Sequence, residues 1–126
     1  MDQQLQERFR VYEQENLASP EIVNFVRNIL LWLEHTSHHP CTEENVGSLA
    51  SHLMLALARV SRGEELGSEW YPGVHEEAMS LAPLIPWAEH IQSEAKRVLG
   101  LTLPPEEFDF LLLHLGVFQA YQKPLS

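Results

Sequence analysis

Two histidines, His52 and His114, each stand inside a strongly apolar stretch that has helical periodicity. Arg59 follows His52 by the interval at which Glu107 precedes His114, which is about two helical turns, so each histidine shares a helix face with a charged residue. A helix can fix an imidazole by packing while one ring nitrogen stays accessible, as a nucleophilic imidazole requires. The alternative is two boundary histidines that donate to a nearby carboxylate or carbonyl.

Both histidines fall at the edge of an apolar helical stripe, where a side chain is partly exposed in a groove between helices. The candidate site therefore includes the polar residues in line with each ring. These are Asn45 and Arg59 for His52, and Glu107 and Tyr121 for His114.

Capping residues and apolar periodicity predict the helices that carry these side chains. Ser19 followed by Pro20 and an acidic residue is a helix start, and Thr42 followed by two glutamates is another. No stretch alternates apolar and polar residues as a half-buried strand does. The expected elements are a helix or loose arm over 2–17, helices over 20–36, 42–62, 74–83 and 87–100 with a break at Pro83 and Pro86, and a last helix from 104.

The fold class predicted from these elements is all-α, a compact bundle of about five helices with an additional N-terminal helix or arm. The chain has 126 residues, enough for one domain to bury a core without disulfides or metal. We expect a single domain over 1–126, with the N-terminal helix or arm at 1–17 and the core bundle at 18–122.

The composition limits the partners. Eighteen acidic against eight basic residues give a formal charge of −10, which argues against direct binding to nucleic acid or anionic membranes. The longest apolar runs are far shorter than the roughly 20 residues that cross a bilayer. The lone Cys41 and an N-terminus without signal-peptide features predict a cytoplasmic protein.

The order and spacing of several motifs resemble the PTS regulation domain, or PRD, over about residues 17–122. The resemblance implies a five-helix regulatory bundle, often dimeric, of the kind found in bacterial antiterminators and transcriptional activators. The motifs that carry it are Leu49-x-x-His52-Leu53 with Arg59 beyond, Trp70-Tyr71-Pro72 leading into Glu76-Glu77-Ala78, and Pro105-Glu106-Glu107 ahead of Leu113-His114-Leu115.

Carried over to this chain, the resemblance implies that His52 and His114 are phosphoacceptors. The phosphoryl donor would be a phosphocarrier of the sugar phosphotransferase system, chiefly HPr. A phosphoryl group would attract the guanidinium of Arg59 and repel Glu107, which in the unmodified protein would pair with Arg59 or orient His114. The resemblance also implies a homodimer without cofactor that controls transcription or antitermination through a separate regulator, because one regulatory domain fills the chain.

Two positions depart from the family pattern. An acidic residue often precedes the first family histidine, whereas this chain has Ser51 there, and Asp109 replaces a residue that is frequently small. A carboxylate at Asp109 would disfavour a phosphoryl group on His114 if it faced that ring, so His52 is expected to be the better acceptor.

Three other functions stay open. A bundle that mediates protein–protein interaction or dimerisation without phosphorylation would have the same sequence pattern. A zinc site is conceivable at His35, His38, His39 and Cys41, although these ligands come from one segment and lack a second cysteine. An enzyme is not expected, since no phosphate-binding glycine loop, nucleophile elbow or HExxH motif is present. A histidine close to Cys41 in a loop is rarely the oriented base that a thiolate mechanism needs.

Overall fold

A computed structural model describes residues 1–64 and 70–122 of the chain. Within these ranges the protein is helical and has no strand, which confirms the predicted all-α bundle. The elements are α1 (Gln3–Gln14), α2 (Pro20–Ser37), α3 (Glu43–Ser61), α4 (Pro72–Met79), the 3₁₀ turn η1 (Ala82–Leu84), α5 (Ile85–Glu94), its π-helical continuation η2 (Ala95–Leu99) and α6 (Pro105–Ala120).

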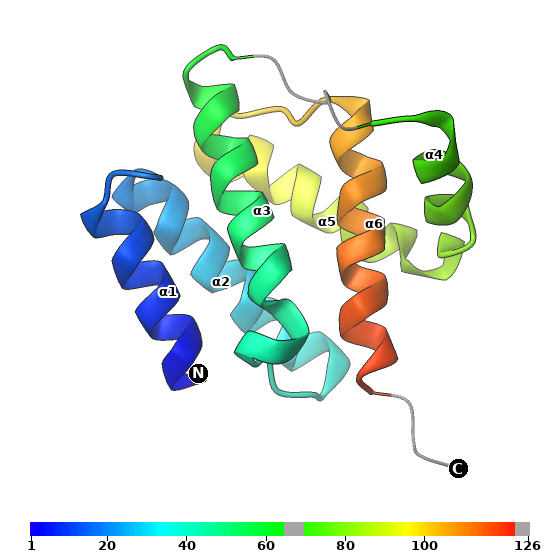
Figure 1. Ribbon diagram of the computed structural model, residues 1–126, viewed down its shortest axis with the longest axis horizontal. Helices are drawn as coiled ribbons and strands as arrows, with labels where there is room; N and C mark the ends of the chain where they lie inside the picture. Colours follow the sequence, from blue (N-terminus) through cyan, green and yellow to red (C-terminus); the bar gives the residue numbers. More distant parts are fainter. Residues whose placement is uncertain (65–69, 123–126) are drawn as a thin grey trace.

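The last helix lies at the centre of the arrangement. α6 packs against α3 on one side, α4 on another and α5 behind it, while α1 and α2 pack together on the far side of α3 (Figure 1). Segments far apart in sequence are thereby brought together, because α3 and α6 run side by side. None of the helices in the described ranges is long and apolar enough to span a membrane.

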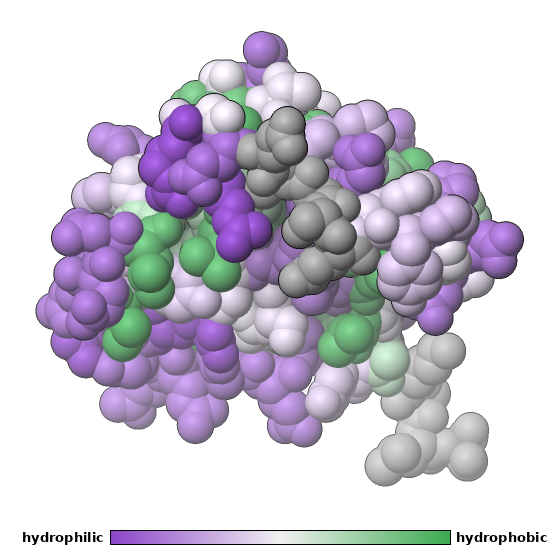
Figure 2. All heavy atoms as spheres, turned by 45° about the horizontal axis from the view of Figure 1, so that its top comes forward, coloured by the Kyte–Doolittle hydropathy of each residue, from purple (hydrophilic) through white to green (hydrophobic). Residues whose placement is uncertain are grey.

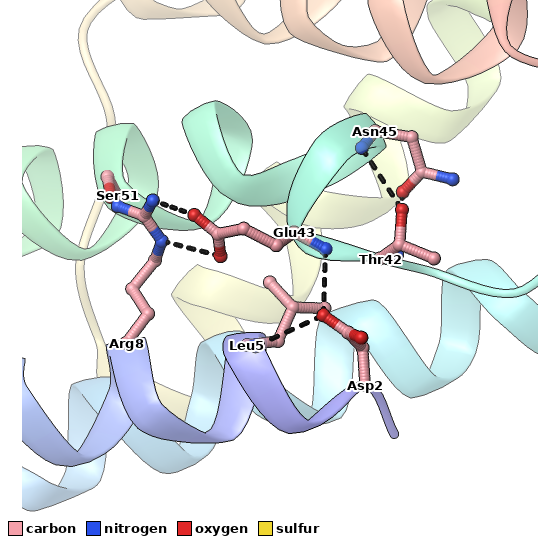
Figure 3. Close-up of polar contacts among 7 residues, drawn as sticks. All are labelled: Asp2, Leu5, Arg8, Thr42, Glu43, Asn45 and Ser51. Atoms are coloured by element: carbon pink, nitrogen blue, oxygen red, sulfur yellow. Dashed lines mark hydrogen bonds and ion pairs between the residues drawn. The ribbon is translucent and has the colours of Figure 1, made fainter.

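Local capping explains why α2 and α3 begin where the sequence predicts. The Ser19 hydroxyl accepts a hydrogen bond from the Ile22 amide at 3.3 Å, and a proline occupies the first turn of α2. Thr42 and Asn45 form a capping box, in which the Asn45 amide donates to Thr42 Oγ1 at 3.2 Å (Figure 3). The Thr42 amide donates in return to Asn45 Oδ1 at 2.7 Å. These caps fix the register of the helix that carries His52.

The helices of the second half differ from the prediction in their boundaries. The helix expected over 74–83 ends at Met79, and Pro83 lies in the following 3₁₀ turn. Pro86 does not interrupt a helix but lies in the first turn of α5. Backbone amides in a first turn have no partner within the helix, so the lack of an N–H in proline costs nothing there. Gly100 ends η2 with φ of 69°, a left-handed conformation that suits glycine.

The N-terminal segment is a packed helix rather than a loose arm. Leu5 and Phe9 are fully buried, so α1 contributes to the core. The Asp2 carboxylate accepts the Leu5 amide at 3.3 Å and the Glu43 amide at 3.0 Å, which joins the N-termini of α1 and α3 (Figure 3). Arg8 pairs with the Glu43 carboxylate beside that junction and donates to the hydroxyl of Ser51, next to His52. This arrangement anchors α1 along α3.

If α1 is part of the core, the Phe9→Ala variant will lose about 3–5 kcal/mol of unfolding free energy, because a fully buried aromatic ring leaves a cavity. The matched control is Val11→Ala on the same helix, whose side chain is partly exposed and should cost no more than about 0.5 kcal/mol. Urea denaturation measures both variants. A loss of unfolding free energy in Phe9→Ala as small as that in Val11→Ala would mean that α1 does not stabilise the bundle.

Candidate functional site

The two histidines singled out by sequence meet in the structure. His52 projects from α3 and His114 from α6, and their ring centroids lie 4.9 Å apart with 40° between the planes. Phe110 flanks the pair, with its ring centroid 5.4 Å from that of His52. Glu107, Phe110 and His114 follow one another at helical spacing, so one face of α6 presents all three to α3.

A buried carboxylate holds one of the two imidazoles. Nε2 of His52 contacts Oε2 of Glu107, whose side chain is 5% exposed, whereas the His52 side chain is 27% exposed. An ionised carboxylate only accepts hydrogen bonds, so the His52 nitrogen that faces it carries the proton. In the neutral ring the lone pair is therefore on Nδ1. Glu107 thus fixes both the orientation and the tautomer of His52.

The second imidazole is held in its neutral form. Burial lowers the pKa of His114 to about 4, and the nearby His52 ring acts in the same direction, while Glu107 opposes the change. His114 is therefore uncharged at neutral pH and retains a lone pair on one ring nitrogen. The site combines an oriented imidazole, a neutral imidazole and a buried carboxylate.

The four residues expected to support the histidines do not all lie beside them. The partner of Glu107 is His52 rather than Arg59, which is exposed in the last turn of α3, about 10 Å further along the helix axis. Asn45 belongs to the capping box of α3, and its side-chain amide also donates to the Pro40 carbonyl at 3.0 Å. Tyr121 is exposed just beyond α6. Of the four residues, Glu107 is the one brought into contact with His52.

Asp109 faces away from the histidine pair, so its carboxylate does not stand against the His114 ring. It is 5% exposed and lies on the α4 side of α6, where it accepts a hydrogen bond from Trp70 Nε1 at 2.9 Å. Nδ1 of His75 lies 3.1 Å from Asp109 Oδ2. His75 and its cluster with Asp109 and Trp70 were not predicted from the sequence. The available signal was an acidic residue within the apolar run 108–113, since a buried carboxylate requires a polar partner.

The segment considered for zinc does not bring its ligands together. Cys41 is buried, and its thiol donates to the Leu30 carbonyl at 3.4 Å. Burial, with a smaller contribution from Glu34, raises the pKa of the Cys41 thiol to about 12, so the thiolate that binds metal or attacks a substrate is disfavoured. His35, His38 and His39 lie exposed on the surface. Across residues 1–64 and 70–122, no three His, Cys, Asp or Glu side chains are grouped to hold a metal ion.

Comparisons with family models, curated proteins and solved structures find no match for this chain. The function must therefore be argued from the site itself.

The lowered pKa of His114 predicts a pH-dependent stability. The unfolded chain has an ordinary histidine pKa near 6.5 at this position and so binds more protons than the folded protein between about pH 6.5 and 4. The stabilisation is present above that range and is lost as the pH falls through it, by at most about 3 kcal/mol for this group. Denaturation of wild type and His114→Gln between pH 7.5 and 4 should show a smaller loss in the variant.

His39→Gln serves as the control, because His39 is exposed. Its free energy of unfolding should follow that of the wild type at every pH. A pH dependence in His114→Gln as steep as that of the wild type would contradict the assigned neutral state of His114.

Proposed function

We propose that this protein is a regulatory module of the sugar phosphotransferase system, similar to PTS regulation domains, that is phosphorylated on histidine by an HPr-type phosphocarrier. The observation that supports the proposal most directly is the meeting of His52 and His114 from different helices beside the buried Glu107. Sequence spacing alone did not require these side chains to be neighbours. Two histidines with a purely structural role would not need to bring their rings together from two different helices.

The chemistry follows from the protonation of the two rings. The Nδ1 lone pair of His52, or the lone pair of the neutral His114, attacks phosphorus in the phosphohistidine of the carrier. The phosphorus–nitrogen bond of the carrier breaks, and its electron pair returns to the carrier imidazole. The proton on His52 Nε2 can stay on the nitrogen that faces Glu107, where the carboxylate stabilises the positive charge of the phosphorylated ring.

The regulatory consequence depends on the burial of Glu107. A phosphoryl group carries about −1.5 to −2 charges at neutral pH and would stand close to this carboxylate. Repulsion between the phosphoryl group and this carboxylate would offset part of the attraction between Glu107 and the protonated Nε2 of His52, and a buried carboxylate that is held less well by its partner is costly. Relief requires α3 and α6 to shift relative to each other, with the exposed Arg59 available to approach the new charge.

The output would be read by a second protein or a second copy of the chain. Exposed apolar side chains at Val117 and Tyr121 lie at the end of α6, where a shift of that helix would move them. The face drawn in Figure 2 is mostly hydrophilic, and its apolar residues form small separate patches. We propose a homodimer or a complex with a transcription regulator in the cytoplasm, whose assembly responds to the phosphorylation state through the movement of these exposed side chains.

Incubation with phosphorylated HPr should label His52 or His114, and mass mapping of the digested protein will identify the residue. We expect one phosphoryl group per chain, because a second would stand against the first across rings that are 4.9 Å apart. Labelling should disappear in the His52→Ala, His114→Ala double variant and persist in His39→Ala, which removes an exposed histidine.

Absence of label on both His52 and His114 in folded protein would refute phosphorylation. The remaining function would then be an interaction module, whose oligomeric state, measured by sedimentation, would be the same in wild type and in the double variant.

A further inference from the structure

A separate cavity of about 480 Å³ lies among α4, α5 and the start of α6. Its volume falls within the range of about 300–1,000 Å³ that is usual for small-molecule sites. The apolar part of its wall comes from Trp70, Met79, Leu103, Pro105 and Phe108. The His52–Glu107 pair does not line it, so this cavity is distinct from the proposed phosphorylation site.

The polar side chains of the cavity wall are two carboxylates, Asp109 and Glu106, together with His75 and Gln92. Neither a lysine nor an arginine is among the described residues of its wall. Asp109 is almost completely buried, yet its hydrogen-bond donors are the Trp70 indole at 2.9 Å and the His75 ring at 3.1 Å. An indole carries no charge, and the His75 side chain is 54% exposed, so its contact with the carboxylate is open to water. The described partners of this carboxylate include no lysine or arginine.

A carboxylate has about four acceptor positions, and two donors leave capacity for another. Because Asp109 lines the cavity, a donor inside the cavity can approach this side chain. A positive charge there would offset the cost of burying the anion, and the faces of Trp70 and Phe108 attract cations as well. The apolar wall favours a ligand that also has a hydrocarbon body.

We propose that this cavity binds a small organic cation, namely a primary amine with an aromatic or similarly apolar body. The ammonium group lies against Asp109 and Glu106, and the apolar body packs against Trp70 and Phe108. The formal charge of −10 on the chain adds a long-range attraction for such a ligand. This proposal is independent of histidine phosphorylation.

Three probes of nearly equal size separate charge from shape: phenethylamine, 2-phenylethanol and phenylacetate. The indole N–H of Trp70 is the reporter, because it donates to Asp109, and its ¹H–¹⁵N signal is assigned with Trp70→Phe. The indole signals of Trp32 and Trp87, which do not line the cavity, are internal controls. Phenethylamine should shift the Trp70 signal saturably and bind at least about tenfold more tightly than the alcohol, with the carboxylate weakest.

The Glu106→Gln variant should weaken phenethylamine binding several-fold and leave binding of the alcohol unchanged. Asp109→Asn should remove the preference for the amine, and Glu76→Gln, which removes an exposed charge on α4 outside the cavity wall, should retain it. Equal affinity of folded wild-type protein for the amine and the alcohol would overturn the proposal, as would a Trp70 signal that does not respond to the amine. The wild-type comparison stands even if Asp109→Asn fails to fold.

Discussion

The burial of the Glu107 carboxylate is the constraint on which the site depends. A charge that is removed from water needs a hydrogen-bonded partner, and α6 places this one in its first turn facing α3. His52 supplies the partner from the neighbouring helix. The pair therefore fixes the register between α3 and α6, and it also determines which nitrogen of His52 is free to react. Any added negative charge acts on the same contact that holds the helices together.

The same helix presents acidic side chains in two directions. Residues two positions apart in an α-helix point about 200° from each other, so Glu107 faces α3 while Asp109 faces α4. Each carboxylate contacts an imidazole from another helix, His52 on one side and His75 on the other. The central position of α6 makes these two contacts part of the bundle's packing as well as candidate sites. A change at either one bears on a helix that contacts most of the others.

Sequence alone predicted the helices well, because Ser19, Thr42 and the apolar stripes are local signals. The sequence left the N-terminal segment as either a helix or an arm, since a short amphipathic segment gains its stability from the surface it packs on. The pairing of Glu107 with His52 was not predicted, because helical spacing identifies which residues share one face of a helix but not which helix packs against that face. The direction in which Asp109 points was left open for the same reason, since its partners Trp70 and His75 come from a different part of the chain.

A double-mutant cycle on the His52–Glu107 contact tests this account most directly. Unfolding free energies are measured for wild type, His52→Ala, Glu107→Ala and the double variant at neutral pH. A favourable coupling energy of about 1–3 kcal/mol is expected, because His52→Ala leaves the buried Glu107 carboxylate without its partner and Glu107→Ala leaves the half-buried His52 ring without its acceptor. Additivity of the two changes to within about 0.5 kcal/mol would contradict it, since the residues would then not depend on each other.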